Sequence, residues 1–187
     1  MGYHITASDI SSIELAEAQS RADERGLGIR FARADFRTLE DVFAEQFNIV
    51  IAMDNALPHM LTSSDLQLAI QSIVGRMQAG GIFVASIRDY DVLLKSKPPY
   101  SPPYIHEVGD GRRVSFQTWS WKGQNYHLVQ YIIDDADELH ASKFECEYRA
   151  TRRQELTDLL LASGCSDVVW RTPEETGFYQ PIVIAKM

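Results

Sequence analysis

Residues 47–55 read FNIVIAMDN, and this stretch decides the fold class of the chain. Residues 47–53 are apolar except for Asn48, which is the pattern of a strand covered on both faces. The polar pair Asp54 and Asn55 follows at once. Ligands of open parallel sheets bind outside the carboxyl ends of the strands. The junction therefore predicts an α/β fold whose functional residues come just after its strands.

The segments around this strand alternate between short β-like runs and longer helix-like segments, which is typical of βαβ units. We expect further strands at residues 3–7, 29–33 and 82–87, and helices at residues 12–25, 39–44 and 66–77. Residues 11–14 offer a capping box for the first helix, Gly26 ends that helix, and Gly80 with Gly81 breaks the third. The order of elements predicts a mostly parallel, Rossmann-like sheet.

The second half of the chain opens with a proline-rich loop at residues 97–104. Beyond it, alternating residues predict a three-stranded antiparallel insertion within residues 112–149, with a turn at residues 134–137. We expect residues 1–187 to form a single domain that contains this insertion.

The chain then returns to the main sheet. Residues 151–154 offer a second capping box for a helix that Gly164 ends. Residues 167–171 and 182–186 read as strands with no helix pattern between them. We expect them to be antiparallel neighbours, because a parallel crossover needs a longer connection.

Charge and cysteine content narrow the function. The 187 residues include 18 Lys and Arg against 26 Asp and Glu, a formal net charge of −8. This balance disfavours nucleic acid and anionic membranes, which both attract clustered positive charge. Cys146 and Cys165 lack the spacing of a metal or redox site and are expected to be reduced. No stretch approaches the roughly 20 apolar residues that cross a bilayer. We expect a cytoplasmic protein with a small-molecule partner.

Polar residues at the predicted strand ends are candidate ligand contacts, and each also has a purely structural interpretation. Asp9 could bind a ribose, as the acid after a second Rossmann strand does, or it could cap the next helix. Asp35 could likewise cap a helix, and Asp54 with Asn55 could form a simple turn. Residues 88–91, RDYD, follow the strand at residues 82–87.

Other catalytic motifs are missing from the sequence. The histidines form no HxH or HExxH spacing, which leaves a metal site without support, and no serine or cysteine lies in a GxSxG turn. His59 alone among them lies in a predicted strand-end loop, where we expect it to form part of a substrate-pocket wall. The aromatic residues of the insertion are expected to be mostly packing residues, with a minority closing a pocket.

Four segments, taken in order, resemble the class I S-adenosylmethionine-dependent methyltransferases. They are residues 5–11 (ITASDIS), 34–36 (ADF), 49–55 (IVIAMDN) and 77–83 (MQAGGIF). The resemblance implies S-adenosylmethionine as the cofactor, with no metal and no obligatory catalytic residue. It implies cofactor contacts at Asp9, Ile10, Ala34, Asp35, Phe36 and Met53, and a substrate side formed by Asn55, His59, Arg88 and Tyr90.

A narrower resemblance is to the glycine and sarcosine N-methyltransferases. It rests on residues 86–91 (SIRDYD), on the insertion ending in residues 142–144 (SKF), and on residues 177–181 (GFYQP). In that group an arginine just after the SKF stretch holds the substrate carboxylate, whereas this chain has Glu145. A carboxylate that faced the pocket would favour a cationic or amine acceptor, which implies N-methylation.

The glycine-rich loop that follows the first strand in this family has no match in the chain. The sequence lines up with the family from its second strand onward, so the first βα unit is missing from the pattern. We expect an upstream segment in the natural protein, direct pairing of residues 3–7 with 47–53, or a homo-oligomer in which another chain fills the gap. Two functional alternatives stay open: a cofactor-less binding module of this fold, and a nicotinamide-dependent Rossmann enzyme.

Overall fold

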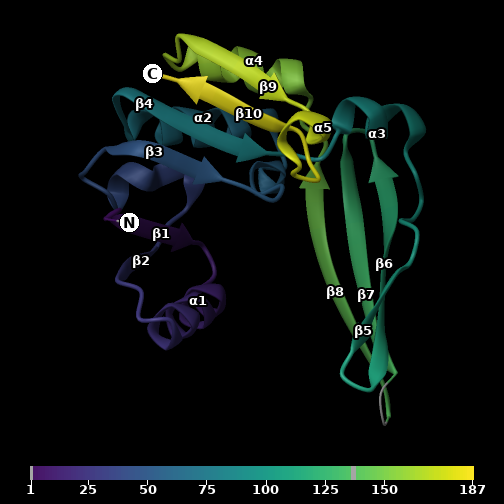
Figure 1. Ribbon diagram of the computed structural model, residues 1–187. Coiled ribbons are helices and arrows are strands. Elements are labelled where there is room, and N and C mark those ends of the chain that lie inside the picture. The colour runs from purple at the N-terminus through teal and green to yellow at the C-terminus, as the bar shows by residue number, and fades with distance from the viewer. Residues whose placement is uncertain (1, 136–137) are drawn as a thin grey trace.

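The computed structural model describes residues 2–135 and 138–187, which are arranged around three sheets (Figure 1). The first sheet pairs β1 (Ile5–Asp9) with β2 (Ile29–Arg33) in parallel. The second has the order β3 (Phe47–Ala52), β4 (Met77–Ser86), β10 (Ile182–Lys186) and β9 (Asp167–Arg171). The third has the order β5 (Tyr104–Val108), β6 (Gly111–Lys122), β7 (Asn125–Asp135) and β8 (Leu139–Arg149).

The helices connect these strands. They are α1 (Ser12–Glu24), α2 (Ser63–Gly75), α3 (Tyr90–Ser96), α4 (Arg153–Ala162) and α5 (Pro173–Thr176), with 3₁₀ helices η1 (Phe36–Asp41) and η2 (Leu57–His59). The predicted α/β class is confirmed, as are the parallel β3–β4 pair and the antiparallel β9–β10 pair. The helix predicted at residues 39–44 is instead the 3₁₀ helix η1.

β1 and β3 belong to different sheets. In the described part of the chain, β1 pairs with β2 alone and β3 with β4 alone. The expectation that these two strands pair directly is therefore wrong. In Figure 1 the β1–β2 pair and α1 lie apart from the larger sheet. The connection after β2 is docked on α2, where the N–H of Leu39 donates to Ser72 Oγ at 2.8 Å. This docking holds the small sheet in place without an edge contact to β3.

The sheet that contains β3 has one covered and one open face. The covered face carries small and aromatic residues packed against apolar side chains of α2 and α4: Phe83, Ala85, Val183 and Ala185. On the other face, Ile49 and Ile51 of β3 are 53% and 63% exposed. Ile82, the register partner of Ile49, is exposed there too. The prediction of a strand covered on both faces is wrong, because no described element packs against this face.

α1 begins where the sequence predicts, but its cap has a different second member. The hydroxyl of Ser11 accepts the N–H of Glu14 at 3.3 Å. The N–H of Ser11 donates to the Asp9 carboxylate at 2.7 Å, taking the place that a Glu14 side chain has in a capping box. Asp9 is the last residue of β1, which lies two residues later than predicted. Gly26, at a φ of 62°, follows the helix end as expected.

β4 begins earlier than predicted. The strand starts at Met77 and continues through Gly80 and Gly81, so the two glycines do not precede it. The pairing of β3 with β4 shifts register between Phe47 and Ile49. A Cβ on Gly81 would lie 2.8 Å from the carbonyl oxygen of Gln78 and 3.1 Å from that of Asn48. Glycine is therefore required where the two strands cross this irregularity. The preceding helix, predicted at residues 66–77, is α2 at residues 63–75, and it buries one apolar face: Leu66, Ala69, Ile70, Ile73 and Val74.

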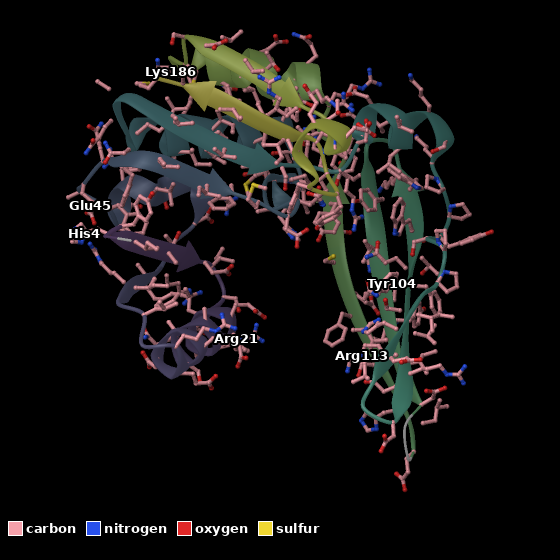
Figure 2. The ribbon with its side chains drawn as sticks, in the orientation of Figure 1. His4, Arg21, Glu45, Tyr104, Arg113 and Lys186 are labelled. Carbon is pink, nitrogen blue, oxygen red and sulfur yellow. The ribbon has the colours of Figure 1, made fainter. Side chains whose placement is uncertain are left out.

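The antiparallel insertion has four strands rather than three, because β5 adds to the edge of β6. Cross-strand pairs such as Arg113 with Asp134, 2.6 Å apart, hold its distal part. Figure 2 shows Tyr104 and Arg113 on that part, away from the larger α/β sheet. Residues 136–137 of the predicted turn lie outside the described residues.

The second predicted capping box is wrong. α4 has Arg152 as its N-cap, and no side chain caps it. The hydroxyl of Thr151 instead donates to the carbonyl of Arg149, since Thr151 is fully buried at the end of the insertion. Across residues 2–135 and 138–187, no helix is long and apolar enough to span a membrane. Both cysteines are free.

Candidate functional site

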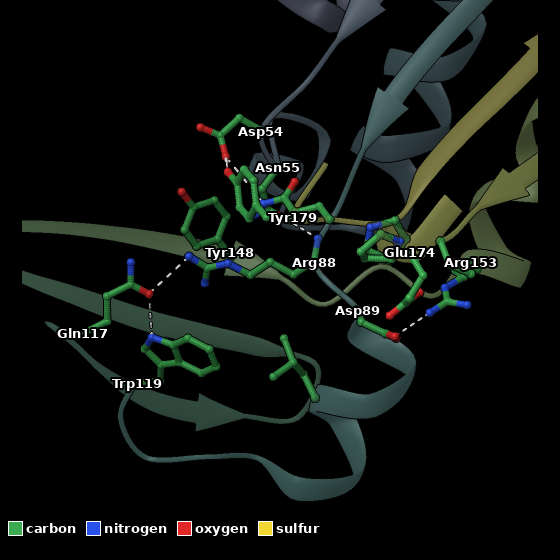
Figure 3. A pocket seen from close by; sticks show the side chains of 15 residues that line it. Asp54, Asn55, Arg88, Asp89, Gln117, Trp119, Tyr148, Arg153, Glu174 and Tyr179 are labelled. Atoms are coloured by element: carbon green, nitrogen blue, oxygen red, sulfur yellow. Dashed lines mark hydrogen bonds and ion pairs between the residues drawn. The ribbon is translucent and has the colours of Figure 1, made fainter. Parts of the chain in front are cut away.

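A cavity of about 730 Å³ lies where the carboxyl ends of β3 and β4 meet the insertion and the last loop of the chain (Figure 3). Asp54, Asn55 and Arg88 line it from the strand ends, as the topology predicts. Gln117, Trp119 and Tyr148 line it from the insertion. The site is thus built from segments that are far apart in sequence.

The turn after β3 is held in a left-handed backbone conformation. Asp54 and Asn55 have φ values of 57° and 64°, which cost energy for residues with a side chain. Ser86 at the end of β4 stabilises both: its Oγ accepts the Asp54 N–H at 2.7 Å, and its carbonyl accepts the Asn55 N–H at 3.1 Å. The interpretation of Asp54 and Asn55 as a turn is thus correct, and both residues of this turn line the cavity.

A one-way chain of hydrogen bonds runs beneath the cavity. Arg88 donates to the Tyr126 hydroxyl at 2.9 Å, and the Tyr90 hydroxyl donates to Asn55 Oδ1 at 3.0 Å. The two tyrosine hydroxyls are 2.9 Å apart. Because each hydroxyl has one proton, Tyr126 must donate to Tyr90. Asn55 Oδ1 also accepts the N–H of Arg88 at 3.1 Å, so both ends of the chain are tied to the same turn.

Tyr90 was predicted to line the substrate side, and this is corrected by its burial. Its side chain is fully buried and lies outside the cavity lining, because its hydroxyl is taken up between Asn55 and Tyr126. Burial raises the pKa of Tyr90 and of Tyr126, although the neighbouring Arg88 cation lowers both in part. Both phenols therefore stay protonated at neutral pH.

Arg88 extends from the strand end across the cavity to the insertion. Its second terminal nitrogen donates to Gln117 Oε1 at 3.2 Å. Its guanidinium carbon lies 5.1 Å from the Trp119 ring centroid and 5.4 Å from that of Tyr148, both within cation–π range. Arg88 therefore lines the cavity, and its role on the substrate side stays a prediction.

Asp54 forms the acidic side of the cavity. The hydroxyl of Tyr179 donates to the Asp54 carboxylate, and Gln180 Nε2 lies 3.5 Å from the same oxygen. Partial burial, together with Asp54, raises the pKa of Tyr179 to about 12, so the phenol remains a donor at neutral pH. Deeper along the wall, Arg153 pairs with Asp89 at 2.5 Å.

Except for Met53, the predicted cofactor contacts lie at the end of the small sheet, and none of them lines this cavity. Asp9 and Ile10 are exposed at the end of β1, and the Ala34 N–H donates to the Asp9 carbonyl at 3.1 Å. Ala34 is buried and Phe36 is half-buried against the core. Met53, also half-buried, connects β3 to the Asp54 turn.

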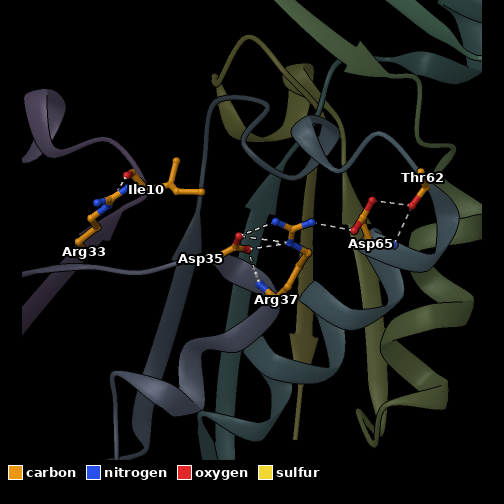
Figure 4. A network of polar contacts seen from close by, with 6 residues as sticks. All are labelled: Ile10, Arg33, Asp35, Arg37, Thr62 and Asp65. Carbon is orange, nitrogen blue, oxygen red and sulfur yellow. Dashed lines mark hydrogen bonds and ion pairs between the residues drawn. The ribbon is translucent and has the colours of Figure 1, made fainter.

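Asp35 is engaged by a neighbouring arginine (Figure 4). It caps η1 by accepting the Arg37 N–H at 2.9 Å, and the Arg37 guanidinium binds it again at 2.7 Å while bridging to Asp65 at 2.9 Å. These contacts hold the pKa of Asp35 below its ordinary value. Arg33 in turn donates to the carbonyl of Ile10 at 2.9 Å. The interpretation of Asp35 as a helix cap is thus correct. Asp9 also acts at a helix start, but only its Oδ1 accepts a hydrogen bond there, from the Ser11 N–H.

Two further predicted residues have clear positions. The His59 ring lies 4.4 Å from the Tyr148 ring and outside the cavity lining, and desolvation there lowers the pKa of His59. Glu145 does not face the cavity: it pairs with Lys143 and with His127 on the insertion. The electrostatic argument for a cationic acceptor from Glu145 is therefore wrong, because local partners neutralise this carboxylate.

Comparisons with known proteins agree with this architecture. A family profile described as "Methyltransferase domain" matches residues 1–81. In three dimensions, 99% of the chain superposes on 75% of an S-adenosylmethionine-dependent methyltransferase from Clostridium acetobutylicum, with a TM-score of 0.79 and 17% identity. The chain has the fold of the class I S-adenosylmethionine-dependent methyltransferases.

Further similar proteins are also named as methyltransferases. An amino pentose methyltransferase from Micromonospora echinaspora, solved with bound S-adenosylmethionine, matches 98% of the chain over 73% of its own length, with a TM-score of 0.77 and 16% identity. A glycine/sarcosine N-methyltransferase of Parasynechococcus marenigrum is 29% identical over 94 residues, which are 50% of this chain and 33% of the relative. A second, from Halorhodospira halochloris, is 23% identical over 60% of this chain and 42% of its own length. The chain spans less than half the length of these curated relatives.

Sequence reasoning missed part of the cavity. Gln117 and Arg153 gave no signal, since each lies in a segment where polar residues are common and only the fold brings them to the strand ends. Tyr179 lay within the GFYQP segment but was not singled out. The expectation that a few insertion aromatics close a pocket is met by Trp119 and Tyr148.

Proposed function

We propose that the chain provides the acceptor side, and part of the cofactor side, of an S-adenosylmethionine-dependent methyltransferase that acts on a small-molecule amine. The observation that carries the proposal is the cavity at the carboxyl ends of β3 and β4, where an acid and an arginine face the same space. The shared fold and the N-methyltransferases among the relatives support it.

The residues of the small sheet fit the cofactor. Asp9 engages only Oδ1 with Ser11, which leaves its second oxygen to accept ribose hydroxyls. Ala34, whose N–H donates to the Asp9 carbonyl, and the half-buried Phe36 would border the adenine. Bound S-adenosylmethionine would supply an electrophilic sulfonium methyl. Since Asp35 is held by Arg37, we assign it a weaker role than Asp9.

On the acceptor side the protein positions the amine and excludes water. Asp54 can accept a hydrogen bond from an amine, and Tyr179 holds the Asp54 carboxylate in place. A base is useful only if the amine arrives protonated, so no obligatory catalytic residue is needed. The net charge of −8 and the free cysteines support a small-molecule partner and a cytoplasmic location.

A second candidate is a binding module of the same fold that does not use the cofactor. One observation favours it: Asp9 and Asp35 both have local partners. A nicotinamide-dependent enzyme is a weaker alternative, because the antiparallel β10 and the insertion are those of the methyltransferase fold.

Calorimetric titration with S-adenosylmethionine, S-adenosylhomocysteine and NAD separates these functions. The methyltransferase proposal predicts saturable binding of the first two ligands and none of NAD. Asp9→Asn keeps an oxygen for the Ser11 N–H but removes the carboxylate charge, and it should weaken binding about tenfold or more. Asp23→Asn, an exposed acid on α1, is the matched control. Binding of none of the three ligands would favour the module.

A further inference from the structure

The cavity beside Arg88 presents hydrogen-bond donors whose local acceptors are already used. Gln117 Oε1 accepts from Arg88 and, at 3.0 Å, from Trp119 Nε1. Asn55 Oδ1 accepts both the Arg88 N–H and the Tyr90 hydroxyl. Of the five N–H donors of the Arg88 guanidinium, two have partners among the described residues. The remaining N–H donors of Arg88 therefore lack hydrogen-bond acceptors among the described residues.

Asn55 adds a second unfilled donor. Its side chain is 3% exposed, and it lines the same cavity as Arg88. Its Nδ2 is buried without a hydrogen-bond partner among the described residues. A buried donor of this kind costs free energy until an acceptor reaches it. Since Asn55 Oδ1 is fixed by two donors, the amide cannot turn to relieve the deficit.

Arg88 forms no ion pair among the described residues, although Asp54, Asp89 and Glu174 line the same cavity. All its described partners are neutral: the Tyr126 hydroxyl, the Gln117 amide and the rings of Trp119 and Tyr148. The other cavity arginine, Arg153, differs, because it pairs with Asp89 and Asp91. Asp54 lines the cavity as well but is held by Tyr179 and forms no ion pair with Arg88 in the described structure. A half-buried guanidinium held in this way is suited to a planar anion.

The geometry points to Arg88, with Asn55 Nδ2, as the site for an anionic group on the acceptor, a carboxylate above all. This inference rests on the proposed function, since it names the second end of the acceptor whose amine lies at Asp54. The anion would thus bind at the end of β4 and not at the position after the SKF stretch, where the chain has Glu145. Glu145 on β8 points away from the cavity and is neutralised by its neighbours. Tyr126 and Gln117 are positioning residues that aim the guanidinium.

Binding of small probes, measured by calorimetry in the absence of any cofactor, tests the inference apart from the proposed function. The probes are β-alanine and its amide, β-alaninamide, which differ only in the anionic group. Wild-type protein should bind β-alanine about tenfold to hundredfold more tightly. Phosphoethanolamine against ethanolamine is the second pair, and comparison of the two pairs shows whether the site prefers a carboxylate or a phosphate.

Variants locate the preference. Arg88→Met should abolish the difference between acid and amide, whereas Arg152→Met, which removes an exposed arginine of equal charge, should leave it unchanged. Arg88→Lys keeps the charge without the planar fork and should retain only part of the preference. If Arg88→Met does not fold, two results still test the inference: the preference of the wild-type protein for β-alanine over its amide, and the reduced preference of Arg88→Lys.

Equal affinities for acid and amide, a preference that survives in Arg88→Met, or no binding of any probe would overturn the inference. Failure to bind S-adenosylhomocysteine would overturn the proposed function alone, because the probes are measured without it.

Discussion

Truncation of Ile51 to alanine should barely destabilise the protein, although Ile51 lies in the most apolar strand of the chain. Its side chain is 63% exposed, so only about a third of it leaves water on folding. Full burial of an isoleucine is worth about 1.5 to 3 kcal/mol, and Ile51→Ala should therefore cost about 0.5 to 1 kcal/mol. The same substitution at Ile70, which is fully buried in α2, should cost about 2 to 5 kcal/mol.

Urea denaturation followed by tryptophan fluorescence measures both values. The exposed position of Ile51 would be contradicted if Ile51→Ala lowered the free energy of unfolding as much as Ile70→Ala does. That result would mean that something covers the open face of β3 in solution. A dependence of the midpoint on protein concentration would then identify the cover as a second copy of the chain.

Two other predictions follow from local geometry. Gly81→Ala places a Cβ 2.8 Å from the Gln78 carbonyl oxygen and should lower the free energy of unfolding by about 1 to 3 kcal/mol. Gly28→Ala is the control and should change it little, because no atom lies within 4 Å of the added Cβ. Urea denaturation midpoints compare the two variants, and equal effects would show that the close approach at Gly81 is not costly. Arg37 lowers the pKa of Asp35, so the stabilisation from this pair is present above the ordinary carboxyl pKa and is lost as the pH falls through the lowered value. At neutral pH the wild-type protein should be more stable than Arg37→Ala by less than about 1 kcal/mol, because the site is exposed. This difference in the free energy of unfolding, measured by urea denaturation, should shrink below about pH 4. A difference that stays constant at lower pH would show that the Asp35–Arg37 pair is not responsible.

The strand ends could be predicted from the sequence because, in an α/β chain, polar residues that directly follow a short apolar run mark the point where a strand stops. Asp54, Asn55 and Arg88 came from this rule, and all three line the cavity. The rule fails for Tyr90, since it says which residues follow a strand but not which way a side chain turns. Whether Tyr90 faces the cavity depends on Tyr126, which is 36 residues away along the chain.

The open face of β3 could not be predicted, because an apolar strand reads the same whether or not another layer covers it. Only the positions of the other elements show that Ile49 and Ile51 face no packing partner among the described residues. The electrostatic argument from Glu145 was wrong for a similar reason. The charge of Glu145 and its place on the same face of β8 as Lys143 are visible in the sequence, but the sequence does not show that this face is the one away from the cavity.

We propose above all that residues at the carboxyl ends of β1, β2 and β3 together bind S-adenosylmethionine. A map of backbone amide chemical-shift changes on addition of S-adenosylhomocysteine tests it most directly. We expect the largest changes at residues 9–11, 34–36 and 53–55. Changes confined to the distal insertion around Arg113, or no saturable change at all, would contradict it.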